Sequence, residues 1–105
     1  MRNAPHRFEI VRRDTVDEID GRPVFEWSVL ATVSGWFTFL RAEEVPQWES
    51  QHVTASARIP TGVAITTRDR LKVLSPAAPE TEGWWQIVTV RFSPVHLRVM
   101  LRLVA

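Results

Sequence analysis

The stretch "HVTASARI", residues 52–59, sets a period of two that recurs along this 105-residue chain. Its apolar residues at alternate positions fall on one face of an extended chain, and they are Val53, Ala55, Ala57 and Ile59. The residues between them are His52, Thr54, Ser56 and Arg58. This alternation is typical of a strand with one face in a core and the other in solvent.

The same period returns in "HLRVMLRLV", residues 96–104, with its alternate apolar side chains predicted inward: Leu97, Val99, Leu101 and Leu103. Shorter strands are expected in the segments 7–13, 24–30, 32–40 and 70–74. "WWQIVTVRF", residues 84–92, is apolar on both faces, as in a strand that is covered on both sides or lies at an interface. The count is six or seven strands.

Parity within these strands also places most of the aromatic residues in the core. The side chains expected inward are Phe8, Ile10, Phe25, Trp27, Val29, Val33, Gly35, Phe37, Phe39, Leu71 and Val73. Turn residues separate the segments, at Asp20 to Pro23, at 60–62 and at 93–94. We therefore predict one all-β domain over residues 1–105, a small six- to seven-stranded β-barrel with a long polar loop or short helix between central strands.

Two segments between strands are acidic. "DTVDEIDG", residues 14–21, reads as an acidic hairpin tip, because residues 16 and 27 lack the acids that a calcium loop would need there. "RAEEVPQWESQ", residues 41–51, has room for a helix only over 42–50, where Pro46 is compatible with a helix start. As an extended excursion it would reach roughly 17 Å from the barrel.

Composition and motifs argue against catalysis. The formal net charge is +1, cysteine is absent, and the three histidines lack the spacing of a metal site. No nucleophile elbow, phosphate-binding loop or dinucleotide fingerprint is present. We expect no enzyme activity, no metal and no cofactor. No apolar run approaches the length that spans a bilayer, so we expect no membrane contact and synthesis in the cytoplasm.

Tryptophans left over after the core is filled are candidate contacts with a neighbouring subunit or partner. Twelve of the thirteen basic residues are arginine, whose planar fork suits fixed ion pairs. The candidate interface residues are Trp36, Trp48, Trp84, Trp85, Arg12 and Arg13. The alternative is a small oligonucleotide-binding β-barrel that stacks single-stranded bases on these tryptophans.

The order of features resembles the phage head-closure family, also called head–tail stoppers or head–tail connectors of the neck. It runs from "HRFEIVRR" through the acidic turn "DEIDGRPVFEW", "LATVSGWFTFL", a long polar segment, "SARIPTG" and "TRDRLKVL" to "LRLV". The tryptophan six residues after the glycine of the turn and the "DRL" at 69–71 look most like the family. The resemblance covers nearly the whole chain. The segment "SPAAPETEG", residues 75–83, departs from it, because it is longer and richer in proline than the corresponding segment of the family.

This resemblance implies a structural virion protein that forms a homo-oligomeric ring in the virion neck after assembly in the host cytoplasm. The ring would lie between a portal or adaptor protein and a tail protein, closing the channel, retaining packaged DNA without reading its sequence, and offering the tail a docking surface. The implied channel-side loop comprises Arg41, Glu43, Glu44, Val45, Pro46, Gln47, Trp48, Glu49 and Gln51. The charged residues of this loop sum to −2 per copy, which repels DNA rather than binding it.

Overall fold

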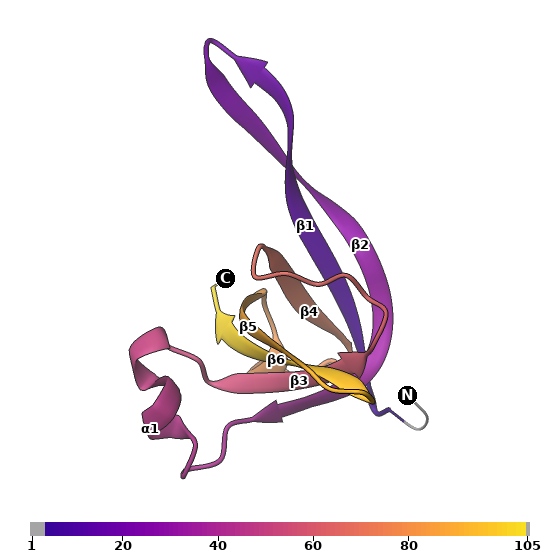
Figure 1. The fold of residues 1–105 in the computed structure, drawn as a ribbon, viewed down its shortest axis with the longest axis vertical. Helices are drawn as coiled ribbons and strands as arrows, with labels where there is room; N and C mark the ends of the chain where they lie inside the picture. The colour runs from indigo at the N-terminus through magenta and orange to yellow at the C-terminus, as the bar shows by residue number, and fades with distance from the viewer. Residues whose placement is uncertain (1–3, 105) are drawn as a thin grey trace.

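Six antiparallel strands close into a barrel in the order β1-β2-β3-β6-β5-β4 (Figure 1). The computed structural model describes residues 4–104, apart from the side chains of Thr15 and Val16. The strands are β1 (His6–Ile19), β2 (Arg22–Phe39), β3 (Ala55–Pro60), β4 (Asp69–Ser75), β5 (Trp85–Phe92) and β6 (His96–Leu103). The predicted all-β barrel is confirmed, and so is the short helix between central strands, α1 (Val45–Trp48).

β2 joins two segments, 24–30 and 32–40, that were predicted as separate strands. No turn residue separates 24–30 from 32–40, so the chain continues as one strand of 18 residues. The register of its pairing with β1 shifts by one residue, because Ile10 pairs with Ala31 whereas Val11 pairs with Val29. Leu30 is therefore the extra residue of a β-bulge, a feature that bends a strand and increases its twist.

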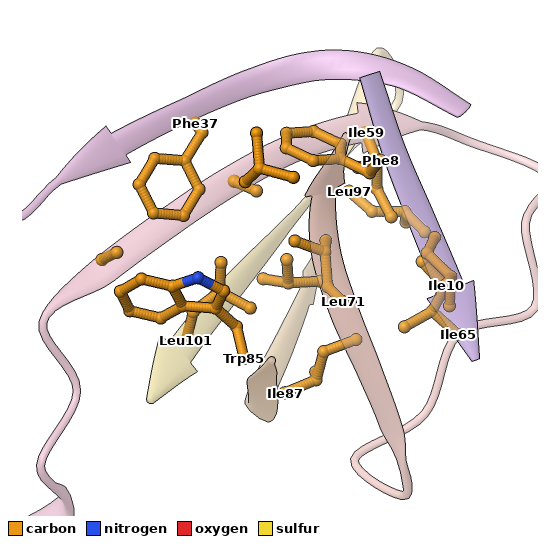
Figure 2. Packing of buried hydrophobic residues seen from close by; sticks show 14 residues of the cluster. Phe8, Ile10, Phe37, Ile59, Ile65, Leu71, Trp85, Ile87, Leu97 and Leu101 are labelled. Atoms are coloured by element: carbon orange, nitrogen blue, oxygen red, sulfur yellow. The ribbon is translucent and has the colours of Figure 1, made fainter. Parts of the chain in front are cut away.

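The barrel interior is filled by alternate side chains from all six strands (Figure 2). The inward predictions for β3 and for Phe8, Ile10, Phe37, Leu71 and Val73 are confirmed, and Leu97, Val99 and Leu101 of β6 follow the same pattern. Trp85 lies in this core, where its indole Nε1–H donates a hydrogen bond to the carbonyl oxygen of Thr81 at 3.1 Å. Phe39 and Leu103 were also predicted inward, but they are exposed at the ends of their strands.

A second, smaller cluster lies on the outer surface of the barrel. Trp48 of α1 packs there with Val53 and Met100, and Leu40 and Val88 pack against them. Met100 has the outward parity of β6, yet it is fully buried because α1 covers it. This cover explains why 84–92 is apolar on both faces: Ile87 points into the barrel, whereas Val88 lies beneath the helix.

The β1–β2 hairpin continues far beyond the barrel (Figure 1). β1 pairs with β4 only as far as Arg12, and from there to Ile19 it pairs with β2 alone. We call residues 13–28 the arm; its seven β1 residues reach about 23 Å at ~3.3 Å each. Asp20 and Gly21 form the turn with φ values of 53° and 76°, which confirms the acidic hairpin tip.

The arm corrects a core prediction. Phe25, Trp27 and Val29 were expected inward, but their exposed fractions are 47%, 40% and 59%. Parity within a strand identifies side chains that share a face, but burial also requires a second layer above that face. Their part of β2 has no strand other than β1 beside it, so these apolar side chains remain on the surface.

Candidate interaction surfaces

A hollow of the surface lies on the outer face of β2, β3 and β6, and we call it the arginine groove. Its volume is about 860 Å³. Trp36 pairs in register with Arg58, and Arg58 pairs with Arg98, so these side chains stand in a row across three strands. Further lining residues are Thr38, Phe39, Arg41, Glu43, Glu44, Ser56, Val95 and His96. The groove thus joins arginines to apolar side chains.

One wall of the groove is held by an ion pair. Arg98 Nη2 donates to Glu44 Oε2 at 3.0 Å, and the Arg41 backbone N–H lies 3.4 Å from Glu44 Oε1. The hydrogen bond from Arg98 and then that from Arg41 lower the pKa of Glu44 below its ordinary value. Arg41 and Arg58 form no ion pair with the residues that the structure describes. Their guanidinium groups are open to a ligand.

We predict that replacing both Glu43 and Glu44 with alanine leaves the melting temperature nearly unchanged. Glu43 is exposed, and both partners of the Glu44–Arg98 pair contact solvent, where ion pairs contribute little stability. Thermal unfolding followed by circular dichroism measures the change, with Glu49→Ala as a control for a charge lost outside the groove. A loss of many degrees in the double variant alone would contradict the prediction.

The remainder of the 41–51 segment folds back on the barrel. Pro46 lies in the first turn of α1, as expected, and the 3-10 helix η1 (Glu49–Gln51) follows. The extended excursion is therefore wrong. Val45, Pro46, Gln47, Glu49 and Gln51 are exposed on the outside of this short helical segment.

Trp48 and Trp85 are not available as surface contacts, so their prediction as interface residues is wrong. Trp48 is only 9% exposed because it covers Met100, with the Arg91 guanidinium 5.4 Å from its ring centroid. Trp85 is only 2% exposed, inside the barrel. In both cases the side chains that bury the ring come from distant parts of the chain, so the local sequence pattern did not reveal them.

The other two predicted tryptophans remain partly exposed but lie on different elements. Trp36 lines the arginine groove. Trp84 precedes β5, with Lys72 Nζ 5.4 Å from its ring centroid. The structure therefore brings Trp36, but not Trp84, together with a set of arginines.

Arginines also cover aromatic rings at the base of the arm. The Arg13 guanidinium lies 4.2 Å from the ring centroid of Phe25, and that of Arg70 lies 4.5 Å from the ring centroid of Trp27. Such cation–π contacts hold rings in place and leave one face available. Arg13, predicted as an interface residue, is exposed. The aromatic residues beside it were missed as surface residues, since their parity was assigned to the core.

Arg12, predicted as an interface residue, is partly exposed and is engaged in contacts within the chain. Its Nε and Nη2 donate to the two carboxylate oxygens of Asp69 at 2.8 and 3.0 Å. Nη2 also donates to the carbonyl oxygen of Ala64, and the Thr66 backbone N–H donates to Asp69. The hydrogen bond with Asp69 raises the pKa of Arg12.

Within residues 4–104, no group of three or more histidine, aspartate and glutamate side chains is placed to hold a metal ion. The most buried carboxylate, Asp69, already has Arg12 and the Thr66 N–H as partners. No helix in this part of the chain is long and apolar enough to cross a membrane.

Comparison with known proteins gives a likeness of fold. No family model and no curated protein matches the chain. The solution structure of protein SF1141 from Shigella flexneri 2a superposes with a TM-score of 0.75, covering 100% of this chain and 98% of that one. At 17% sequence identity, the likeness shows that the two proteins share their fold from end to end.

Proposed function

We propose that this chain is a structural subunit of the neck of a phage or phage-like particle, where copies form a ring between the portal or adaptor and the tail. The observation that carries the proposal is the arm. It leaves the barrel as a two-stranded hairpin and holds large apolar side chains in solvent. Exposed apolar surface of this kind marks contacts with other proteins.

The placement of the two surfaces favours a ring over a pair. β2 begins at the tip of the arm and ends beside the arginine groove, so the two surfaces lie at opposite ends of one strand (Figure 1). Contacts between different surfaces of identical chains are heterologous, and they generate rings when the rotation closes. The family resemblance in the sequence supports the same assembly.

In this assembly the barrel closes the channel, retains packaged DNA and presents the tail with a docking surface. The resemblance assigns the channel side to 41–51. Three glutamates and one arginine lie in that segment, and a ring would repeat their net charge of −2 around its axis. Carboxylates at a channel wall repel the phosphates of DNA, which suits passage or plugging better than clamping.

The test is to locate the chain in particles. Electron microscopy of native particles, with an affinity tag on the chain bound by a gold-labelled antibody, is expected to place the label between head and tail. A tagged capsid protein in the same particles serves as the positional control. Particles that contain the chain nowhere, or label confined to heads or tail tips, would contradict the proposal.

A second candidate function is the binding of single-stranded nucleic acid in the arginine groove. The observation in its favour is that Trp36 stands in register with Arg58 there, close to Arg41 and Arg98. Bases stack on such rings while arginines contact the phosphates. Glu43 and Glu44 in the same wall oppose a polyanion.

For this second function we predict quenching of tryptophan fluorescence by oligothymidine at low salt, with affinity falling steeply as salt rises. The quenching should disappear in Trp36→Leu and persist in Trp84→Leu, the matched variant outside the groove. Absence of quenching in the unmodified chain at low salt rejects nucleic-acid binding.

A further inference from the structure

The charge of this protein is divided between the arm and the rest of the chain. Five carboxylates and two arginines give residues 13–28 a charge of −3, and since the whole chain carries +1, the remaining residues carry +4. Opposite charge at two ends of a molecule favours head-to-tail encounter of copies. The division therefore points to a second copy of this chain as a partner of the arm.

The tip of the arm joins acids to one apolar side chain. Asp17, Glu18 and Asp20 surround Ile19, the last residue of β1, which is 58% exposed and pairs only with Arg22 of β2. Among the side chains that the structure describes, the one hydrogen bond at the tip is local, from the Glu18 backbone N–H to Asp17. Within the described residues, these carboxylates form no ion pair.

The arginine groove offers the complementary set. Arg41 and Arg58 provide two guanidinium groups without an ion-pair partner in residues 4–104, Arg98 is balanced by Glu44, and with Glu43 counted the lining keeps a net charge of +1. Trp36, Phe39 and Val95 provide the apolar lining. A guanidinium binds a carboxylate through two parallel hydrogen bonds, which fixes orientation as well as charge. A ligand with a few carboxylates beside an apolar side chain fits this groove better than a long polyanion does.

An arm does not reach the groove of its own chain. The tip is the start of β2 and the groove lies at its end, and the molecule is 48 Å long in its greatest dimension. Figure 1 shows the tip and the end of β2 at opposite extremes of the fold. The occupant of the groove must come from outside the chain.

We propose that the arm tip of one copy, Asp17 to Asp20, docks in the arginine groove of the next copy. The carboxylates bind Arg41 and Arg58, and Ile19 packs against Trp36 and Phe39. This deepens the proposed function, on which it rests, by naming the contact that links one subunit of the ring to its neighbour. Each copy gives one arm and receives one, so the contact is heterologous and is suited to repeat around an axis.

Charge exchange provides the test. The tip variant Asp17→Lys/Glu18→Lys and the groove variant Arg41→Glu/Arg58→Glu each place like charges in contact, and each is expected to weaken self-association at least ten-fold. Mixing the two variants restores every contact, because lysine tips meet glutamate grooves and acidic tips meet arginine grooves. A chain carrying all four changes should self-associate alone. Sedimentation velocity at low salt measures each case.

Arg68→Glu/Lys72→Glu is the matched control, since it changes charge by the same amount on exposed residues outside the groove. It should associate as the unmodified chain does. Circular dichroism shows whether each variant is folded.

Three outcomes overturn the docking: single-surface variants that associate normally, mixtures that fail to recover, or an unmodified chain that stays monomeric at millimolar concentration and low salt. If the groove variant loses oligothymidine binding while the unmodified chain stays monomeric, the groove belongs to nucleic acid. Failure of the proposed function is distinguishable, because it appears as absence of the chain from the particle neck, whatever the variants do in solution.

Discussion

Replacing Arg12 with methionine is expected to lower the free energy of unfolding by about 3 kcal/mol, because it leaves the carboxylate of Asp69 buried without its counter-ion. Asp69 is 0% exposed, and Arg12 supplies two of its hydrogen bonds. Methionine preserves most of the length and the apolar stem of arginine. For a domain of this size the change corresponds to a melting temperature lower by about 12 °C or more.

Two further variants separate charge from packing. Arg13→Met is the neighbouring control, since Arg13 is exposed and lies over Phe25, and it should change stability by less than about 1 kcal/mol. Asp69→Asn removes the charge and keeps an oxygen for the Thr66 N–H, so adding it to Arg12→Met should recover about 1 kcal/mol. If the double variant is no more stable than Arg12→Met, an unpaired charge is not the cause.

The position of Asp69 shows what the sequence predicted and what it did not. The "DRL" at 69–71 was singled out only through its resemblance to a family, and its spacing has no chemistry of its own. The structure gives Asp69 a structural role, because its carboxylate links the start of β4 to Arg12 on β1, across 57 positions of sequence. A contact of such long range leaves no local period by which to predict it.

The alternation of apolar residues in β3, β4 and β6 was sufficient to predict the barrel, since each strand buries one face in the common core. The arm was not predicted, although its acidic turn was, because the length of a hairpin beyond a barrel depends on where the neighbouring strand stops pairing. β4 leaves β1 at Arg12. Phe25 and Trp27 keep the parity of a strand there but have no layer to cover them.

The burial of Trp48 within the segment 41–51 was missed for the opposite reason. Its Trp48 lies among polar residues and suggested exposure, whereas the buried partner, Met100, lies far along the sequence on the polar face of β6. Val88 lies in a segment that is apolar on both faces, and Met100 is an apolar residue on the face of β6 expected to be outward. Together they indicate that another element covers this side of the barrel. Combined with Trp48, that signal predicts a helix packed flat rather than a projecting loop.

Replacing Gly35 with alanine is expected to destabilise the barrel by about 3 kcal/mol or to prevent folding. A Cβ at this position would overlap the carbonyl oxygen of Arg58 and come within 3.0 Å of the Phe8 ring. The Arg58 oxygen belongs to the backbone of β3, which pairs with β2 from Trp36 onward, so it has no rotamer by which to move aside. Glycine in a strand often marks such a close approach of two backbones.

The measurement for Gly35→Ala is thermal unfolding, or circular dichroism of the purified chain where no folded state remains. Ser34→Ala is the control next to it on an exposed position of β2 and should stay within about 0.5 kcal/mol. Gly62→Ala separates the two reasons for glycine, since its φ is +95° but a Cβ there meets nothing within 4 Å. Backbone strain alone costs about 1–2 kcal/mol, so Gly35→Ala should be the more damaging change. If the order is reversed, β2 and β3 have room to separate, and the close approach at Gly35 does not hold the barrel closed.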